Sequence, residues 1–322
     1  MKILVTGGAG YLGSVLTPLL LREGHQVRVL DDLSQGGSGL LGLFPDDNFS
    51  FRKGDIRSAE SVREALEGRD AVVHLAGIVG DPACARQPEL ARQVNLEGSL
   101  GLFDKASSLG VGRFVFASTC SNYGKMVEGS GYLDERAELR PVSLYAETKV
   151  AVEKSLLSSA SGAPAVTVLR CSTLHGVSPR MRFDLTVNEF ARDLLTRRKL
   201  VVFGQQFWRP YVHVRDAARA ISTVLSAPIE TVGGEVFNVG DSSQNFQKGR
   251  IVELVRAQVD GPVEIEQVQK VEDPRDYRVL FDKIRDRLNF RITRTVEDGI
   301  REVMDTIRQG VITDYDDPRY RN

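Results

Sequence analysis

The feature that most constrains the fold is a glycine-rich turn that directly follows a short apolar strand near the N-terminus. Residues Lys2–Thr6 read KILVT, and residues Thr6–Gly13 read TGGAGYLG. The turn fits G-x-G-x-x-G from Gly8 and opens a predicted helix over Leu12–Glu23. Glycine is needed because the backbone must approach a pyrophosphate without a Cβ, while the helix N-terminus offers free N–H groups to phosphate. The turn predicts a dinucleotide site; a glycine-rich connection without a ligand is the alternative.

Two acidic residues end the second predicted strand and bear on which dinucleotide binds. Strand Gln26–Asp31 leads into Asp32, and Asp31 stands 18 residues after Gly13. This is close to the ~20 residues expected for the carboxylate that binds the adenosine ribose. A carboxylate there repels a 2′-phosphate, and no arginine follows until Arg52, so the sequence favours NAD over NADP. The alternative is that both aspartates cap a loop.

Short apolar strands alternate with longer helical segments through the first half of the chain. Nearly continuous apolar strands indicate a parallel sheet covered on both faces. We therefore predict an α/β fold, with a Rossmann-type doubly wound parallel sheet over residues 1–175. A smaller mixed α/β substrate lobe follows over residues 176–322, with some chain exchanged between the two. The further strands predicted in the first half are Phe49–Lys53, Ala71–Leu75, Arg113–Ser118 and Ala165–Arg170, and the helices are Ser61–Leu66, Glu89–Leu109 and Ser143–Ala160.

The second half mixes helices and strands, and its last residues are polar. The tail Asp314–Asn322 is expected to fray. Predicted helices are Leu185–Arg197, Val214–Leu225, Gln247–Val259, Asp282–Leu288 and Val296–Arg308, and predicted strands are Leu200–Phe203 and Glu235–Val239.

Composition excludes several classes of protein. Lysine plus arginine total 42 and aspartate plus glutamate 43 among 322 residues, so a net charge of −1 gives no reason to bind nucleic acid or an anionic membrane. Cys84, Cys120 and Cys171 are scattered and there are four histidines, so we expect neither a disulfide scaffold nor a metal site. Apolar runs are too short for a signal peptide or a bilayer span, and a cytoplasmic protein is expected.

A Tyr-x-x-x-Lys sequence, Tyr145 to Lys149, lies on the predicted helix Ser143–Ala160. The i,i+4 spacing places both side chains on one face. We expect the Lys149 ammonium to lower the pKa of Tyr145, so that the phenol can take a proton from a substrate hydroxyl. Thr119 follows the fifth predicted strand, at the carboxyl edge where parallel sheets bind ligands. A surface pair, and a plain turn hydroxyl for Thr119, are the alternatives.

Together these residues resemble the extended short-chain dehydrogenase/reductase family, in its NAD-dependent nucleotide-sugar epimerase/dehydratase branch. The resemblance covers nearly the whole chain. It is carried by Thr6–Gly13, Asp31, Gly54-Asp55-Ile56, His74-Leu75-Ala76-Gly77, Val94-Asn95, Ser118-Thr119, Tyr145 with Lys149, Arg170-Cys171-Ser172, Arg209–Asp216 and Phe237–Gly240.

The resemblance implies the cofactor, the site residues and the assembly. The cofactor is NAD, the substrate is a nucleotide-diphosphate sugar, and Thr119, Tyr145 and Lys149 are catalytic. A homodimer is implied, through a four-helix bundle of the helices at 89–109 and 143–160. Implied cofactor contacts are Gly7, Gly10, Tyr11, Leu12, Gly13, Asp31, Asp32, Asp55, Ile56, Leu75, Ala76, Gly77, Tyr145, Lys149 and Cys171. Substrate contacts are expected from Thr119, Ser121, Thr173, Arg182, Asn188, Arg209, Arg275 and Arg278, with arginines converging on the diphosphate.

The expected activity is that of a nucleotide-sugar epimerase similar to UDP-glucose 4-epimerase. Transient oxidation of a sugar hydroxyl by bound NAD⁺, with Tyr145 as base, is followed by re-reduction. Cys120 and Ser121 stand where the family's 4,6-dehydratases carry Asp-Glu, which argues against dehydratase chemistry, although either residue could transfer a proton. An NAD(P)-dependent 4-ketoreductase or dehydrogenase of a deoxysugar stays open, as does a non-catalytic dinucleotide-binding sensor. His175 is interpreted as structural.

Overall fold

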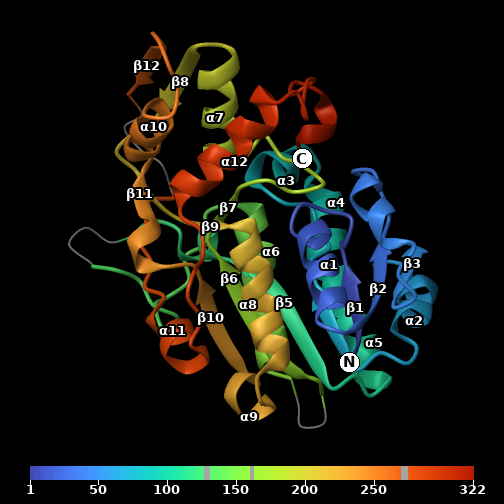
Figure 1. The fold of residues 1–322 in the computed structure, drawn as a ribbon. Coiled ribbons are helices and arrows are strands. Elements are labelled where there is room, and N and C mark those ends of the chain that lie inside the picture. The colour runs from blue at the N-terminus through green and yellow to red at the C-terminus, as the bar shows by residue number, and fades with distance from the viewer. Residues whose placement is uncertain (127–130, 160–162, 270–274) are drawn as a thin grey trace.

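A parallel sheet forms the centre of the molecule, shown in Figure 1 as a computed structural model that describes residues 1–126, 131–159, 163–269 and 275–322. Within these residues seven strands pair in the order β3-β2-β1-β4-β5-β6-β10, and every neighbouring pair is parallel. The strands are β1 (Lys2–Thr6), β2 (Gln26–Asp31), β3 (Phe49–Lys53), β4 (Ala71–His74), β5 (Arg113–Thr119), β6 (Ala165–Cys171) and β10 (Glu235–Val239). The predicted α/β Rossmann-type sheet is confirmed.

The strand order reverses beside β1, which pairs with β2 on one side and β4 on the other. Ligands of open parallel sheets bind where the order reverses, outside the carboxyl ends of the strands. The carboxyl ends of β1, β2 and β3 therefore form one half of this edge, and those of β4, β5 and β6 form the other. All the sheet residues predicted to act in the site follow or end one of these strands.

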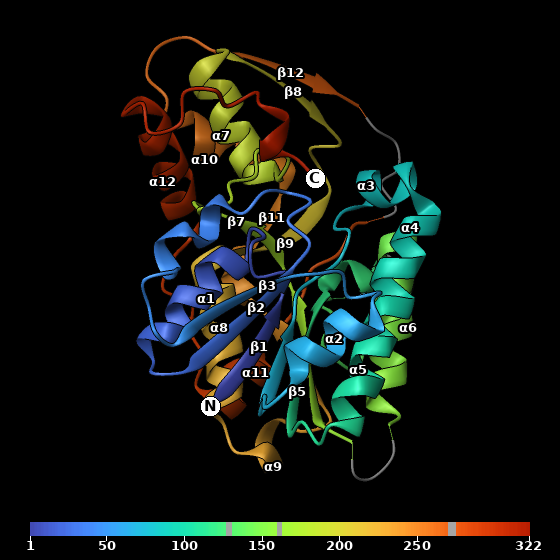
Figure 2. The same ribbon diagram turned by 90° about the vertical axis from the view of Figure 1, so that its right-hand side faces the viewer.

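Helices cover both faces of the sheet because its strands are apolar on both sides. Figure 2 shows α1 and α8 on one face and α2, α5 and α6 on the other. The first face buries Leu16, Leu20 and Ile221, and the second buries Leu102 and Phe114. These helices are α1 (Gly13–Arg22), α8 (Val214–Ser226), α2 (Ala59–Leu66), α5 (Ser99–Ser108) and α6 (Leu144–Leu157).

The long helix predicted over 89–109 is interrupted. It consists of α4 (Pro88–Arg92), one wider π-type turn over Gln93–Gly98, and then α5. The loop before it holds the short helix α3 (Asp81–Arg86), which apolar periodicity could not reveal over six residues. Helix α6 ends at Leu157, and the predicted end at Ala160 lies outside the described residues.

The second lobe packs three helices around its own core. They are α7 (Thr186–Thr196), α10 (Lys248–Arg256) and α12 (Val296–Arg308). They bury Val187, Ile251 and Ile300, among others. Two small sheets complete the lobe, a parallel pair of β8 (Lys199–Phe203) with β12 (Glu264–Val268), and β11 (Asn245–Gln247), β9 (Trp208–His213) and β7 (Thr173–His175) in that order. The helices and strands predicted here are confirmed, whereas β7, β9, β11 and β12 were missed.

Chain is exchanged between the lobes in both directions. From the second half, α8, α9 (Ile229–Val232), β10 and α11 (Asp282–Leu288) belong to the sheet, where β10 extends it beyond β6. From the first half, β7 pairs with β9 of the second lobe. A cut between residues 175 and 176 therefore does not separate two bodies in space.

The polar tail is docked, which corrects the expectation that it frays. Tyr320 O accepts a hydrogen bond from Phe183 N at 2.8 Å. Asn322 bridges the lobes, because its N–H donates to Asp184 at 3.1 Å and its carbonyl accepts from Arg86 at 2.8 Å. Figure 2 shows this end of the chain between the second lobe and α3.

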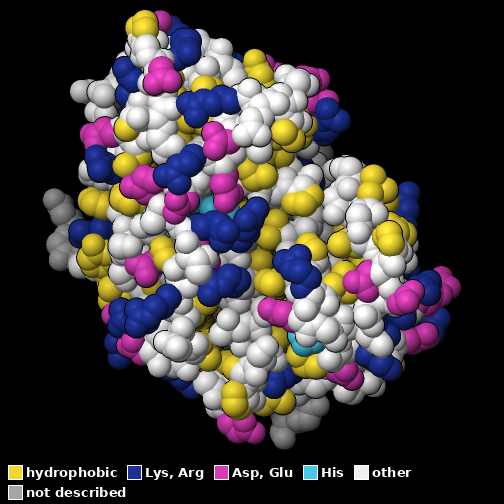
Figure 3. All heavy atoms as spheres, viewed as in Figure 1, with side chains coloured by type: hydrophobic (Ala, Val, Ile, Leu, Met, Phe, Trp, Pro, Cys, Tyr) yellow, Lys and Arg dark blue, Asp and Glu magenta, His cyan; other side chains and the backbone are white. Residues whose placement is uncertain are grey.

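Charges of both signs are mixed on the surface drawn in Figure 3. In the described part of the chain, no helix combines the length and apolarity that a bilayer crossing requires. Among these residues there is also no group of three or more potential metal ligands.

Candidate active site

The glycine turn is as tight as its sequence predicts. Gly7 has a positive φ of 73°, and a Cβ added there would lie 2.6 Å from Ala76 N. A Cβ on Gly13 would lie 2.3 Å from Gly7 O. Neither distance is compatible with a side chain, so the turn leaves a backbone cradle between β1 and the residues after β4. No side chain in the described residues caps the start of α1, whose positive end faces this cradle. The cradle fits a dinucleotide pyrophosphate.

Asp31 is fixed beside the glycine turn by backbone amides. Its carboxylate accepts hydrogen bonds from Ala9 N at 3.0 Å and Leu33 N at 2.9 Å, and burial raises its pKa. Asp32 accepts from Ser34 N at 2.8 Å. The carboxylate of Asp31 therefore stands at the end of β2, where an adenosine ribose would lie.

The walls of this half come from the residues after β3. Asp55 pairs with Arg57, whose guanidinium lowers the pKa of Asp55. Ile56 is 7% exposed and lies against Gly98. An adenine ring would meet an apolar wall at Ile56 and a paired carboxylate at Asp55.

The loop after β4 is tied to both β1 and the π-type turn. Leu75 N donates to Thr6 O at 3.1 Å. Asn95 holds Ile78 through two bonds, accepting from its N–H at 2.7 Å and donating to its carbonyl at 2.9 Å. Leu75, Ala76 and Gly77 are thus held near the glycine turn, and their contact with a dinucleotide stays a prediction.

His74, at the end of β4, links the start of the same loop to β1 and α5. Its ring nitrogens share hydrogen bonds with Thr6 at 2.7 Å and Ser99 at 2.8 Å. Burial lowers the pKa of His74 to about 3, so the ring is neutral and serves as a buried link between β4 and α5.

Tyr145 and Lys149 lie in the first two turns of α6, which Ser143 caps by accepting from Ala146 N at 3.3 Å. The expected effect of Lys149 on Tyr145 is not found. Lys149 Nζ instead donates to Ala117 O on β5 at 2.8 Å and lies 4.6 Å from the centroid of Phe116. Burial raises the pKa of Tyr145 and lowers that of Lys149 to about 8. Desolvation outweighs the attraction that the i,i+4 spacing suggested.

Thr119 ends β5 opposite Cys171 of β6. Its hydroxyl accepts from Ser121 N at 3.1 Å, and Ser121 Oγ accepts from the Tyr277 hydroxyl at 3.5 Å. Burial raises the pKa of Cys171 to about 12, so this thiol contributes an uncharged wall near Lys149.

The environment of Cys120 does not favour a role in proton transfer. Its thiol is 1% exposed and donates to Arg170 O at 3.2 Å. Burial raises its pKa well above the ordinary value for a thiol. Of the two residues that replace the acidic pair, Cys120 is buried and Ser121 is partly exposed.

The predicted substrate arginines have different partners in this structure. Arg182 forms a two-pronged pair with Asp184 at 2.8 and 2.9 Å, and its positive charge partly offsets the burial that raises the pKa of Tyr145. Arg209 lies 5.5 Å from the ring of Tyr277. Arg278 stacks instead on Trp208, at 5.2 Å.

This arrangement separates Arg278 from Arg209. Successive side chains of a strand point to opposite faces. Trp208 and Arg209 are neighbours in β9, so their stacking partners Arg278 and Tyr277 lie on opposite sides of it. The two guanidinium groups lie over different aromatic rings in this structure, and their convergence on a diphosphate stays a prediction.

Asn188 is enclosed and does not face an open site. It is 0% exposed, accepts from Gly176 N at 2.9 Å, and donates to the Tyr11 hydroxyl at 3.1 Å and to Arg182 O at 2.9 Å. Tyr11 itself donates to Gly176 O at 2.5 Å. The side chains of Tyr11 and Asn188 link the glycine turn to the second lobe by hydrogen bonds. We therefore interpret Asn188 as a structural residue and not as a substrate contact. Thr173 lies beside this junction, paired with Tyr211.

His175 belongs to the core of the second lobe. It packs edge-on against His213 with ring centroids 5.3 Å apart, and neither of its ring nitrogens has a hydrogen-bond partner among the described residues. Burial lowers the pKa of His175 to about 3. Both observations agree with its interpretation as structural.

Two residues of the site were missed from the sequence. Asp81 accepts from the hydroxyl of Ser143, the cap of α6, at 2.7 Å and pairs with Arg275 at 2.6 Å, so it joins α3, α6 and the second lobe. Tyr277 links Ser121 to Arg209. These contacts span up to 194 residues of chain, and no local pattern marks them.

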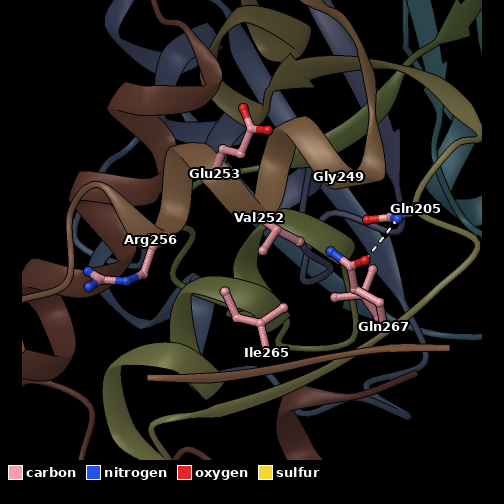
Figure 4. Close-up of a pocket in the computed structure, with 8 residues that line it drawn as sticks. Gln205, Gly249, Val252, Glu253, Arg256, Ile265 and Gln267 are labelled. Atoms are coloured by element: carbon pink, nitrogen blue, oxygen red, sulfur yellow. Dashed lines mark hydrogen bonds between the residues drawn. The ribbon is translucent and has the colours of Figure 1, made fainter. Parts of the chain in front are cut away.

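A separate hollow of about 240 Å³ lies between α10 and the β8–β12 pair (Figure 4). Val252 and Glu253 line it, and Gln205 donates to Gln267 across it at 3.0 Å. None of the predicted site residues is among its lining residues.

The chain is similar in sequence to known proteins along nearly its whole length. Residues 3–240 match the model of the NAD dependent epimerase/dehydratase family. A dTDP-glucose 4,6-dehydratase of Streptomyces niveus is 30% identical over 323 aligned positions, covering 96% of this chain and 93% of that protein. A UDP-glucose 4-epimerase of Streptomyces lividans is 31% identical over 294 positions, covering 85% and 86%.

Solved structures of both kinds share the fold. The dTDP-glucose 4,6-dehydratase DesIV of Streptomyces venezuelae, with NAD bound, has a TM-score of 0.85 at 27% identity, covering 96% of this chain and 97% of its own. The UDP-glucose 4-epimerase of Thermotoga maritima, with UDP-glucose, has a TM-score of 0.84 at 26% identity, covering 97% and 100%.

Proposed function

Because the chain belongs to the NAD-dependent epimerase/dehydratase family, we propose that it is a nucleotide-sugar epimerase of the UDP-glucose 4-epimerase kind. Members of this family are enzymes that use NAD, and this chain is likewise an NAD-dependent enzyme. The observation that carries the choice of epimerase is the environment of Cys120. A buried thiol that donates to Arg170 O, next to the neutral hydroxyl of Ser121, offers no acid and base for loss of water.

The proposed chemistry is a reversible oxidation with no net change in redox state. NAD⁺ bound in the glycine cradle supplies the hydride acceptor, the later hydride donor, and a positive charge near the phenol. Tyr145 takes the proton of the sugar hydroxyl as the carbon loses hydride, and Thr119 orients that hydroxyl. Tyr145 returns the proton after the keto sugar has presented its other face. Burial raises the pKa of Tyr145, so the resting group is a neutral phenol. It has to lose its proton to solvent, favoured by the positive charges of Lys149 and the bound NAD⁺, before the resulting phenolate can accept the proton of the sugar hydroxyl.

The other residues hold and orient the ligands. Lys149 would bond the nicotinamide ribose, and Asp31 the adenosine ribose. Arg182 and Arg209 would take the diphosphate of the sugar nucleotide, because guanidinium groups match phosphate oxygens. Arg182 is the better supported, since its charge acts on Tyr145.

The direct test is turnover of a panel of nucleotide sugars by the purified protein, followed by NMR. We expect interconversion of a 4-epimer pair, such as UDP-glucose and UDP-galactose, with no net consumption of NADH. A 4-keto-6-deoxy product would identify a dehydratase instead. Net oxidation of NAD(P)H with a keto sugar would identify a ketoreductase. NAD binding without turnover of any member of the panel would favour a sensor.

We also propose a homodimer formed through α5 and α6. The two helices pack together on the outer side of the sheet, and Leu109 and Leu157 at their ends are exposed. Light scattering during gel filtration should give twice the monomer mass of 35.5 kDa. A monomer at micromolar concentration would contradict this assembly. Cytoplasmic location stays a prediction.

A further inference from the structure

A single buried carboxylate, Glu153, joins α6 to the ends of the central strands. It accepts hydrogen bonds from the Ser118 hydroxyl on β5, from Asn122 Nδ2 at 2.7 Å, and from the Arg170 guanidinium on β6 at 2.8 and 3.1 Å. Glu153 is 1% exposed and Arg170 is 5% exposed. A buried ion pair is costly unless further hydrogen bonds satisfy it, as they do here.

The contacts continue from Arg170 to a third strand. Arg170 Nη1 donates to the Tyr123 hydroxyl at 3.1 Å, and that hydroxyl donates to Asn238 Oδ1 on β10 at 2.8 Å. We call Ser118, Asn122, Tyr123, Glu153, Arg170 and Asn238 the Glu153 cluster. It connects one helix and three neighbouring strands below the carboxyl edge of the sheet.

The cluster adjoins the proposed catalytic residues without containing any of them. Ser118 directly precedes Thr119, and Lys149 stands one helical turn before Glu153 on α6. The carboxylate thus holds both the strand that carries Thr119 and the helix that carries Tyr145. A displacement of about 1 Å between reacting groups can cost about a hundredfold in rate, so such a link has a large effect on turnover.

Given the proposed function, on which this inference rests, we propose that Glu153 is a positioning residue of the active site. It sets the spacing between Thr119 and Tyr145, and it balances the buried charge of Lys149.

The groups around Lys149 indicate why the charge of Glu153 matters for it. Cys171, Cys84 and His74 face it from β6, α3 and β4. Burial raises the pKa of Cys171 to about 12 and of Cys84 to about 11, and lowers that of His74 to about 3, so all three are uncharged at pH 7. Glu153 supplies the negative charge, and it raises the pKa of Lys149 against the effect of burial.

The test separates this role from simple support of the fold. Glu153→Gln alone leaves the Arg170 cation buried without a counter-charge and is expected to unfold readily. The double variant Glu153→Gln/Arg170→Met removes both charges and is expected to keep a melting temperature near that of the parent protein, since neutral replacements of buried pairs are commonly tolerated.

The readout is the affinity for NAD⁺ measured by calorimetry across a pH series. In the parent protein the affinity should weaken above a midpoint near pH 8, as Lys149 loses its proton. In the double variant we expect that midpoint to fall by about half a pH unit or more. Glu147→Gln, on an exposed residue of the same helix, is the matched control and should leave it unchanged. An unchanged midpoint in a folded double variant, or no midpoint in the parent protein, overturns the proposal.

Ser118→Ala tests the spacing while leaving both charges in place. We expect kcat to fall by about tenfold with an unchanged KM, because the strand end loses one bond to Glu153. An unchanged kcat overturns the positioning role, and this measurement decides alone if the double variant does not fold. Failure of the proposed function looks different, because NAD⁺ would then bind with the expected midpoints while no nucleotide sugar is turned over.

Discussion

The two halves of the site are built in different ways. Around the glycine turn, the proposed ligand-binding groups are backbone amides and side chains that backbone amides hold in place, such as Asp31 held by Ala9 and Leu33. In the second lobe they are long side chains held by partners far away in sequence, such as Arg275 on Asp81 and Arg209 on Tyr277. The first kind is fixed by backbone geometry, whereas the second depends on how the lobes pack. Variants should therefore act on cofactor and substrate separately.

The largest effect is expected from Tyr145→Phe. Removing the hydroxyl eliminates the proposed proton acceptor, so kcat should fall by about 10²–10⁴-fold. NAD⁺ affinity should stay within a few-fold, since Lys149 and the glycine turn are intact. Steady-state kinetics and calorimetry would check both. A variant that keeps its rate would remove Tyr145 from the chemistry.

Next in size is Gly13→Ala, which tests the backbone half. The new methyl group would lie 2.3 Å from Gly7 O, so the turn must shift. Overpacking of this kind costs about 1–3 kcal/mol, which corresponds to a loss of up to about a hundredfold in NAD⁺ affinity. Gly101→Ala on α5 is the matched control, because a Cβ there meets nothing within 4 Å. Equal NAD⁺ affinities for the two variants would contradict the proposal that NAD⁺ binds at the glycine turn.

Arg209→Ala against Arg278→Ala tests the side-chain half. Loss of charge-assisted bonds costs about 1.5–3 kcal/mol, so Arg209→Ala should raise KM for the nucleotide sugar by about ten- to a hundredfold. Arg278 lies on the other side of β9, against Trp208, and its replacement should leave KM within about threefold. If both variants raise KM equally, the two arginines do converge in the complex.

The smallest effect concerns stability, with one buried histidine in each region. His74 and His175 have folded-state pKa values of about 3, below the unfolded value of 6.5. The unfolded chain therefore binds more protons between these values, and stability is lost as pH falls below 6.5. Each histidine should contribute a slope of up to about 1.4 kcal/mol per pH unit. The free energy of unfolding, measured with urea at several pH values between 7 and 5, should change less steeply with pH for His175→Asn than for the parent protein.

Much of the sheet could be predicted from the sequence because its signals are local. Apolar strands such as Ala71–His74 and the glycine turn each carry their information within a few residues. The same holds for Asp31 and Thr119, which end β2 and β5 at the carboxyl edge of the sheet. The boundary at residue 175 could not be predicted as well, because β10 belongs to the sheet by pairing with β6, which lies about seventy residues earlier in the chain.

The electrostatics and the substrate half could not be predicted in the same way. Tyr145 and Lys149 lie four residues apart on one helix as expected, but burial is the largest cause of both pKa shifts, raising that of Tyr145 and lowering that of Lys149. Asn188 looked polar and available, yet its amide is enclosed between Tyr11 and Gly176. Burial and long-range partners are properties of the packed chain, which spacing alone does not encode.

The docked tail has a consequence for how ligands are exchanged. Residues 320–322 bind Phe183 and Asp184 on one lobe and Arg86 on the other, so parting the lobes on this side first strains those few bonds. Release of product would then include a local unfastening of the last residues. Concentrations of urea too low to melt the sheet should accelerate that step.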